Sequence, residues 1–344
     1  MENRQLSIIV PVYNMNHDNN LTFCLDSLIN QTVKNYEIIA VTDASTDDSL
    51  GVLLDYEQKY PEKFKVVTYG ENKRQGGAKN EGLKVATGDW IGFIDSDDWI
   101  TPDFYEKLIK KANETGADIV GCDLNIVSSH TFEVGKIVEG NKPSQTGILD
   151  LEKKKDLFRQ PGSMVIKIYK HSVIKENNLT FPEGIFYEDN CAARIWIPYF
   201  NHFEYINEPN YYYLQHESST VHTITRERCE DRIKAMNMML SGLKERNLYF
   251  TYELEAEDVY TQLGFRITLF SYMLGCKYKE LSFVTKLVND FLLEFPHFKN
   301  NKYFAIPDKE EEKMINLCIK SPMLFYIYYS LLWKYRNLKQ KKGA

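Results

Sequence analysis

The sequence predicts an α/β protein with a mainly parallel central sheet and flanking helices, followed by an α-helical C-terminal region. Over residues 5–123, short apolar runs of strand character alternate with stretches of helical periodicity. Such alternation is typical of βαβ units, which build parallel sheets. From about residue 226, helical periodicity continues to the end of the chain. We therefore expect two domains, 1–225 and 226–344, which also suits a length of 344 residues.

The expected elements follow from these patterns in chain order. Apolar side chains from Leu21 to Ile29 recur at i, i+3, i+4, i+7 and i+8, the spacing of one helix face. The expected strands are Leu6–Val10, Glu37–Val41, Phe64–Thr68, Trp90–Ile94, Ile119–Cys122, Met164–Tyr169 and Tyr211–Leu214. The other expected helices are Ser49–Lys59, Ala78–Ala86, a helix after Pro102, Asp189–Phe200, Arg226–Arg246, Glu253–Leu274, Leu281–Phe295 and Pro322–Lys341. Ligands of such sheets bind beyond the carboxyl ends of the strands, so the loops after the early strands are the first candidates for a site.

Composition excludes several functional classes. The net charge of −6 does not fit the basic surface of a nucleic-acid-binding protein. No apolar run approaches the ~20 residues of a membrane-spanning helix, and the N-terminus lacks the apolar core of a signal peptide. The six cysteines are scattered without CxxC spacing, which is typical of reduced thiols in a cytoplasmic protein.

An acidic cluster follows the fourth expected strand, in the sequence Phe93-Ile94-Asp95-Ser96-Asp97-Asp98. Asp95 and Asp97 are two positions apart, so on extended chain both side chains point the same way. Clustered carboxylates repel one another, and a bound divalent cation relieves that repulsion. Oxygen ligands suit Mg²⁺ or Mn²⁺, which commonly link carboxylates to substrate phosphates. The alternative is a solvated turn in which Asp98 caps the next helix.

A second polar segment follows the second strand, from Val41 to Ser49. Ser45, Asp47 and Ser49 are ordinary turn and N-cap residues, which explains most of this segment. Asp43 is different, because it stands at the carboxyl end of the strand. A carboxylate there can accept the imide N–H of a uracil ring.

Two weaker segments supply further candidate binding residues near the carboxyl ends of the expected strands. Pro11 ends the first strand, and Tyr13 offers a flat face for a nucleobase. The glycine pair at Gly76 enters a helix and lets backbone amides approach an anion, with Lys79 among the nearby positive charges. This segment matches neither the P-loop nor the dinucleotide-binding pattern.

A fifth segment places Glu188 and Asp189 at the start of a helical pattern. Acids at this position are favoured by the helix dipole alone. The functional alternative is a general base.

A metal on Asp95 and Asp97 also suits a second class of enzyme, which catalyses nucleotidyl or phosphoryl transfer. That class would have a basic glycine loop near the N-terminus, where this chain has Pro11 to Asn14.

Together the five segments resemble the inverting family 2 glycosyltransferases with the GT-A fold. The motifs PVYN, VTDASTDDS, GGAKNEG, FIDSDD and YEDN occur in the order and spacing of that family over about residues 5–222. Bacterial members that build surface polysaccharides are the most similar. Two positions depart from the family, which often has Asp in place of Thr42 and Arg in place of Lys79.

The resemblance implies a donor site for a UDP-sugar. The implied nucleotide-binding residues are Pro11, Val12, Tyr13, Asp43, Gly76, Lys79, Asp95 and Ser96. The implied ligands of a Mn²⁺ or Mg²⁺ ion are Asp97, Asp95 and His222. His216 lies in the same serine-rich stretch and is as readily a surface histidine. A member that had lost catalysis would lack these acids or the base, and all of them are present.

The resemblance also implies the chemistry. Asp189 matches the catalytic base, with Glu188 in support, and a hexosyl or N-acetylhexosaminyl group moves with inversion to a glycan or lipid-linked glycan. The C-terminal region is expected to serve the acceptor, an oligomer or a membrane surface. Its last segment, Pro322–Lys341, places aromatics beside a basic tail, as in peripheral proteins at the inner face of the plasma membrane. The alternatives for this segment are a helix packed on its neighbours and a homo-oligomer contact.

Overall fold

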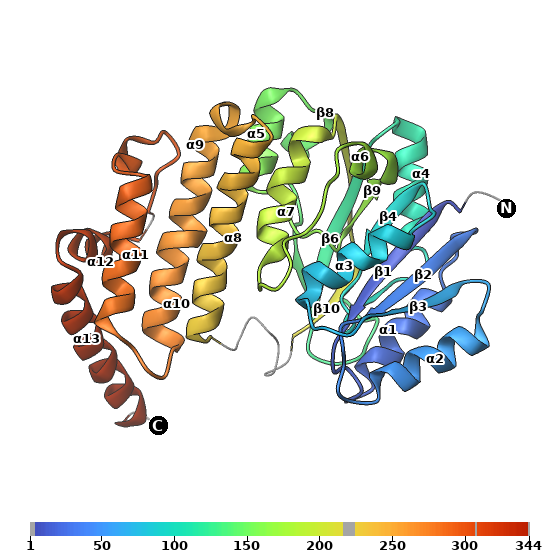
Figure 1. The fold of residues 1–344 in the computed structure, drawn as a ribbon, viewed down its shortest axis with the longest axis horizontal. Coiled ribbons are helices and arrows are strands. Elements are labelled where there is room, and N and C mark those ends of the chain that lie inside the picture. Colours follow the sequence, from blue (N-terminus) through green and yellow to red (C-terminus); the bar gives the residue numbers. More distant parts are fainter. Residues whose placement is uncertain (1–3, 216–223, 307, 343–344) are drawn as a thin grey trace. The chain divides into compact units, whose positions relative to one another are not determined.

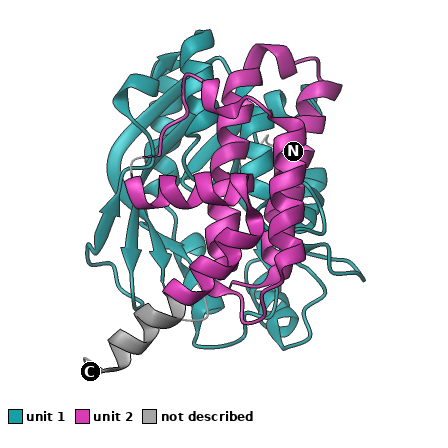
Figure 2. Ribbon diagram, turned by 90° about the vertical axis from the view of Figure 1, so that its left-hand side faces the viewer, with its two compact units in different colours: residues 1–217 teal, residues 218–344 magenta. Residues whose placement is uncertain are grey.

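The computed structural model describes residues 4–342 except 216–223 and 307. The chain divides into two compact units, Met1–Glu217 and Ser218–Ala344 (Figure 2). The boundary expected from the sequence, at residue 225, falls directly before the first long helix of the second unit.

The first unit is built on one mixed sheet with the order β3-β2-β1-β4-β9-β6-β10-β5, in which β7 pairs with β6 and β8 with β10 (Figure 1). The strands are β1 (Leu6–Val12), β2 (Tyr36–Thr42), β3 (Phe64–Thr68), β4 (Trp90–Phe93), β5 (Trp99–Ile100), β6 (Ile119–Val127), β7 (Lys136–Val138), β8 (Gly147–Ile148), β9 (Lys167–Lys170) and β10 (His202–Leu214). Strands β1 to β4 are parallel, and β6 and β10 are parallel to each other. Because β9 is antiparallel to both β4 and β6, the carboxyl ends of β1, β2, β4, β6 and β10 share one edge.

Burial on both faces explains why the apolar pattern of the sequence predicts β1 and β2. Every residue of both strands is buried, as expected for parallel strands covered on both faces. The polar exceptions are paired: Glu37 accepts hydrogen bonds from the Ser7 hydroxyl and the Thr87 amide. Strands β5, β7 and β8 span only two or three residues, too few for a periodic pattern, and were not expected.

The helices of the first unit are α1 (Asn20–Ile29), α2 (Ser49–Lys59), α3 (Arg74–Val85), α4 (Phe104–Thr115), α5 (Leu151–Arg159), α6 (His171–Glu176) and α7 (Glu188–Trp196). Short 3₁₀ turns lie at Pro143–Gln145 and Ile197–Tyr199. The core is rich in aromatic rings. Trp99 is fully buried and stacks on Tyr212 at 5.8 Å between ring centroids, while Trp196 packs on Phe93 and Phe181.

The second unit is helical throughout its described residues, apart from the connecting segments. Its elements are α8 (Arg226–Glu245), α9 (Tyr249–Val259), the π-helical segment η3 (Tyr260–Ile267), α10 (Thr268–Gly275), α11 (Leu281–Glu294), the 3₁₀ turn η4 (Phe298–Asn300), α12 (Lys309–Lys320) and α13 (Pro322–Lys342). The single helix expected over 253–274 is thus interrupted by a π segment, and α12 was not expected. Stacked rings hold the core, among them Phe265 on Phe291 at 4.2 Å.

Two further expectations concern the cysteines and membrane-spanning segments. All six cysteines are buried free thiols, in agreement with the absence of paired spacing. Among the described residues, no helix combines the length and the apolar character needed to cross a membrane.

Candidate active site

The loops after β1 and β2 are bound to each other at the carboxyl edge of the sheet. The Asn14 amide donates to the Ser45 hydroxyl at 3.1 Å, and the Met15 amide donates to the Ser49 hydroxyl at 2.8 Å. The Asp47 carboxylate accepts from the Asn16 amide at 2.9 Å. These polar residues were expected to be turn and cap residues, and in the structure they also anchor the loop beside Tyr13.

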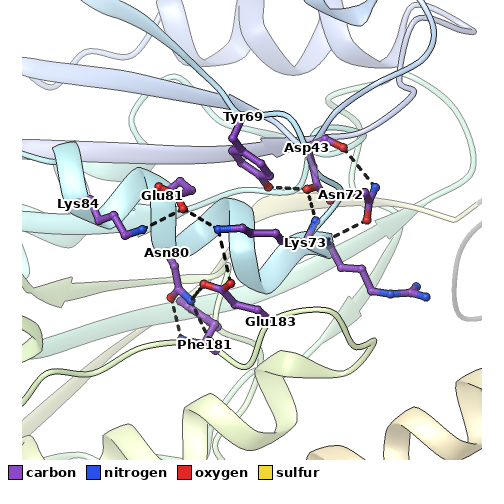
Figure 3. A network of polar contacts seen from close by, with 10 residues as sticks. Asp43, Tyr69, Asn72, Lys73, Asn80, Glu81, Lys84, Phe181 and Glu183 are labelled. Atoms are coloured by element: carbon purple, nitrogen blue, oxygen red, sulfur yellow. Dashed lines mark hydrogen bonds and ion pairs between the residues drawn. The ribbon is translucent and has the colours of Figure 1, made fainter.

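Asp43 is buried at this edge and holds the segment after β3 in place. Its amide donates to the Val12 carbonyl at 2.9 Å. Its Oδ1 accepts from the Lys73 amide at 2.7 Å and from the Tyr69 hydroxyl at 2.5 Å (Figure 3). Its Oδ2 makes no hydrogen bond to any residue that the structure describes, so one carboxylate oxygen is available to a ligand.

Tyr69 is a further candidate site residue, which no sequence motif indicated. It directly follows β3, whose carboxyl end lies beside that of β2, and this position was the available signal. Burial and the neighbouring Asp43 carboxylate raise the pKa of Tyr69, so the phenol stays a neutral donor. Pro11 and Val12 are buried within β1, while Tyr13 is 48% exposed and presents its ring at the edge.

Helix α3 starts four residues earlier than expected, so the glycine pair lies in its first turn. Residues 181–187, which lead into α7 and are called the strap below, pass directly over this turn. A Cβ at Gly76 would lie 1.9 Å from the Pro182 carbonyl oxygen and 3.2 Å from Glu188 Cβ. Close packing of α3 on the strap therefore requires glycine at position 76.

Lys79 and Glu188 form a buried ion pair between α3 and α7. Lys79 Nζ lies 2.8 Å from Glu188 Oε1, and the two residues are 3% and 4% exposed. Burial alone would lower the pKa of Lys79, but the charges of Glu188, Asp95 and Asp189 raise it above its usual value. Lys79 is thus the counter-charge of a carboxylate cluster, a role the sequence did not suggest.

Asp95 belongs to that cluster. Burial is the largest cause that raises its pKa, to about 7; Lys79 opposes the rise, and the carboxylates of Asp97, Glu188 and Asp189 add to it. Ser96 is buried beside it. The cluster joins acids from the loop after β4 with acids from the first turn of α7, which are distant in sequence.

Asp98 has a structural role that differs from the helix cap considered as the alternative. It is fully buried and accepts from the Tyr211 hydroxyl at 2.7 Å and from the Leu214 amide at 3.0 Å. The next helix, α4, has Asp103 at its N-cap position instead. Asp98 therefore secures the end of β10, which leaves Asp95 and Asp97 as the candidates for a metal.

Asp95 and Asp97 fit a divalent cation that takes some of its ligands from the protein and the others from a substrate. Asp95 and Asp97 are oxygen donors in a cluster whose mutual repulsion a cation would relieve. The described residues contain no group of three or more metal-binding side chains arranged around one point. Mg²⁺ does not require three protein side chains, because it commonly binds through one or two carboxylates together with substrate phosphates and water. His222 and His216 lie outside the described residues.

Asp189 is half-buried at the start of α7. Its Oδ1 accepts from the Asn190 amide at 2.8 Å and from the Asn190 side chain at 3.2 Å. Its Oδ2 has no hydrogen-bond partner within the described part of the chain. Burial and the Glu188 charge raise the pKa of Asp189, and Lys79 and the Asn190 amide oppose the rise. A carboxylate with a raised pKa is a better proton acceptor.

Comparison with known proteins decides the family. Residues 7–174 match the family model for glycosyl transferase family 2. EpsH of Bacillus subtilis (strain 168), which carries a glycosyltransferase name, is 32% identical over 265 residues, or 75% of this chain and 74% of EpsH. The chain belongs to glycosyl transferase family 2. The poly(ribitol-phosphate) beta-glucosyltransferase of Bacillus spizizenii is 33% identical over 183 residues, which are 53% of this chain and 27% of that protein.

Solved structures confirm the expected fold class of this family 2 glycosyltransferase. The S. aureus TarS fragment 1–349 superimposes with a TM-score of 0.67 over 96% of this chain and 91% of the fragment, at 19% identity. The same fragment in complex with UDP-GlcNAc gives a TM-score of 0.65 over 96% of this chain and 92% of the fragment, at 18% identity. The likeness therefore extends through the helical C-terminal region, which had no recognised relative at the level of motifs.

Proposed function

We propose that this enzyme transfers a hexosyl or N-acetylhexosaminyl group from a UDP-sugar to a hydroxyl of a glycan, with inversion and with a divalent metal, in bacterial cell-surface polysaccharide synthesis. The observation that carries the proposal is the carboxyl edge of the sheet, which holds Asp43 after β2 and Asp95 after β4, with Glu188 and Asp189 close enough to Asp95 to raise its pKa. The relative that acts on poly(ribitol-phosphate) supports a surface-polymer acceptor. The TarS complexes with UDP-GlcNAc and UDP support a UDP-sugar donor.

The donor half of the site follows from the contacts of Asp43. The free Oδ2 of Asp43 accepts the imide N–H of uracil, and the exposed ring of Tyr13 stacks on the base. Asp97 and Asp95 would hold the cation. The mannosyltransferase PcManGT from Pyrobaculum calidifontis, solved with GDP-Man and Mn²⁺, supports a metal at this kind of fold. It superimposes with a TM-score of 0.50 over 95% of this chain and 87% of that chain, at 14% identity. A bound Mn²⁺ or Mg²⁺ would offset the negative charge that develops on the diphosphate leaving group.

The acceptor half depends on Asp189. An acceptor hydroxyl has a pKa far above 7, so its proton must leave as it attacks the anomeric carbon. Oδ2 of Asp189 accepts that proton, while Oδ1 stays bound to Asn190 and fixes the orientation of the carboxylate. Lys79 pairs with Glu188 beside it at 2.8 Å. One displacement from the face opposite the diphosphate inverts the anomeric configuration.

Calorimetric titration with UDP, GDP, ADP and CDP, with and without Mn²⁺, tests the donor site. We expect Mn²⁺-enhanced binding of UDP and at least about tenfold weaker binding of the others, because cytosine N3 lacks the hydrogen that Asp43 requires and purines are larger. Asp97→Ala should remove the Mn²⁺ enhancement, whereas Asp55→Ala, at an exposed position of α2, should not. Equal binding of all four nucleotides would contradict the role of Asp43, and no binding would favour a non-catalytic assembly subunit.

We also propose that α13 rests on an anionic membrane surface. Its inner face packs into the second unit, where Phe325 and Tyr329 are buried against Phe270. The opposite face carries five residues that are 48–61% exposed: Met323, Leu324, Ile327, Tyr328 and Leu331. Five basic residues follow in the sequence: Lys334, Arg336, Lys339, Lys341 and Lys342. An apolar face beside basic residues is typical of helices at anionic interfaces.

Sedimentation with vesicles tests this face without disturbing the core. The wild-type protein should sediment with phosphatidylglycerol vesicles and not with phosphatidylcholine vesicles. Leu324→Glu with Leu331→Glu should abolish sedimentation, because both side chains are exposed and the substitutions add charge that the lipid repels. Leu293→Glu, at a residue that is 85% exposed on α11, is the matched control and should bind like the wild type. Equal sedimentation of all variants, or none by the wild type, would contradict the proposal.

A further inference from the structure

The strap is tied to α3 by one buried side chain. Asn80 lies on α3 and is 7% exposed. Its Nδ2 donates to the Phe181 carbonyl at 2.9 Å and to Glu183 Oε1 at 3.0 Å, and its Oδ1 accepts from the Phe181 amide at 2.9 Å (Figure 3). Both donor hydrogens and the acceptor oxygen of this amide are thus used on a single segment.

Lys73 adds a second connection and links the strap to Asp43. Its carbonyl accepts from the Gly184 amide at 2.9 Å, and its Nζ lies 3.1 Å from Glu81 and 3.8 Å from Glu183. Its own amide donates to Asp43 at 2.7 Å. The start of α3 therefore contacts both the strap and the carboxylate that we assign to the nucleobase.

The strap needs such anchors because it contains no helix or strand of its own. Its backbone turns through two left-handed residues, Gly184 at φ 73° and Tyr187 at φ 65°, and Tyr187 is the N-cap position of α7. Glu188 and Asp189 follow immediately. The position of the first turn of α7 is therefore set by what holds the strap.

Two of the contact positions share one face of α3. Gly76 and Asn80 are four residues apart, which places them on the same side of the helix, and Lys73 is its N-cap residue. Lys73 and Asn80 bond to the strap, and Gly76 lets the strap approach. Lys79, beside them, holds Glu188 through the buried ion pair. Helix α3 thus contacts both the strap and Glu188, which belongs to the pair Glu188–Asp189 that follows the strap.

We propose that Asn80 is a positioning residue for transfer, which acts by fixing the strap so that Asp189 meets the acceptor hydroxyl. This inference rests on the proposed role of Asp189 as the base. Asn80 itself contacts no substrate. Its effect is on turnover, since a displacement of about 1 Å in a reacting group costs on the order of 100-fold in rate. Nucleotide binding at Asp43 does not use the Asn80 side chain.

The first test is Asn80→Ala, assayed by UDP release from UDP-GlcNAc with Mn²⁺ and by titration with UDP. We expect kcat to fall on the order of 10- to 100-fold, while the Kd for UDP changes by less than about threefold. Hydrogen exchange should rise in a peptide covering 181–189 and stay unchanged in β1. Asn30→Ala is the control, because Asn30 also bonds a backbone carbonyl, Asp26 O at 2.8 Å, but at the end of α1 away from the carboxyl edge.

A swap separates positioning from a general loss of stability. Asn80→Asp keeps an acceptor for the Phe181 amide but sets a second carboxylate against Glu183. Adding Glu183→Gln restores a donor at that contact and removes the repulsion between the two carboxylates, while the Phe181 carbonyl still faces an oxygen of the introduced carboxylate. The double variant should therefore recover part of the kcat that Asn80→Asp loses. Glu183→Ala, at a side chain that is 42% exposed, removes one anchor where folding is not at risk and should lower kcat by a smaller factor.

Two results would overturn the inference. The first is that Asn80→Ala or Glu183→Ala has the kcat of the wild type and the same hydrogen exchange in the peptide 181–189. The second is that affinity for UDP falls by the same factor as kcat. Asp189→Asn distinguishes this failure from failure of the proposed function. If Asp189→Asn retains turnover, the assignment of the base is wrong. If Asp189→Asn is inactive while Asn80→Ala is fully active, only the positioning role is wrong.

Discussion

Asp189→Asn is expected to lower the kcat for UDP release from UDP-GlcNAc by about 10²- to 10⁴-fold, the usual contribution of a general base. Asparagine has nearly the shape of aspartate and can still accept the Asn190 amide hydrogen bond at Oδ1. Its amide nitrogen cannot take a proton from the attacking hydroxyl. The loss should therefore appear in kcat, with the Kd for UDP changed by less than about threefold.

The control for this substitution is Asp55→Asn, an exposed acid on α2, which should turn over like the wild type. Measurement of UDP affinity by calorimetry decides between two roles of Asp189. If affinity falls together with kcat, Asp189 contributes to the nucleotide or metal site instead of serving as the base. Retained turnover would exclude both roles.

The second large effect is on stability. Lys79→Met should lower the free energy of unfolding by about 3–5 kcal/mol, the cost of leaving one charge of a buried pair unpaired. Methionine matches the lysine stem in shape, so the loss comes from Glu188, which is left at 4% exposure without its charged partner. Urea titration followed by tryptophan fluorescence measures the change, because Trp90, Trp99 and Trp196 all lie in the first unit.

Helix α3 supplies its own control. Lys84 also pairs with a glutamate, Glu81 at 2.9 Å, but its side chain is 63% exposed. Lys84→Met should cost no more than about 1 kcal/mol, as is usual for surface pairs. The double variant Lys79→Met, Glu188→Leu should recover part of the lost stability, because it removes the unpaired Glu188 carboxylate, while Asp95 and Asp189 still lack the Lys79 charge. Equal effects of Lys79→Met and Lys84→Met would contradict a buried charged pair.

The sequence alone determined the fold class and most elements of the first unit. Strands β1 and β2 are buried on both faces, so nearly every residue in them is apolar and the run stands out from its surroundings. The acids after β2 and β4 stand out because they directly follow these buried apolar strands. Five such motifs in order were enough to indicate the family, which the comparison with known proteins confirms.

Only the tertiary structure decided which of these residues pair. Lys79 meets Glu188 across 109 positions, and Asn80 meets Phe181 across 101, separations that no local pattern records. Asp98 has the same appearance as Asp97 in the sequence, yet it is buried under β10 and bonded to Leu214. Local periodicity reports which face of an element is buried, because that depends on the element alone. The partner of a buried charge depends on how distant segments pack, and packing is settled only when the chain folds.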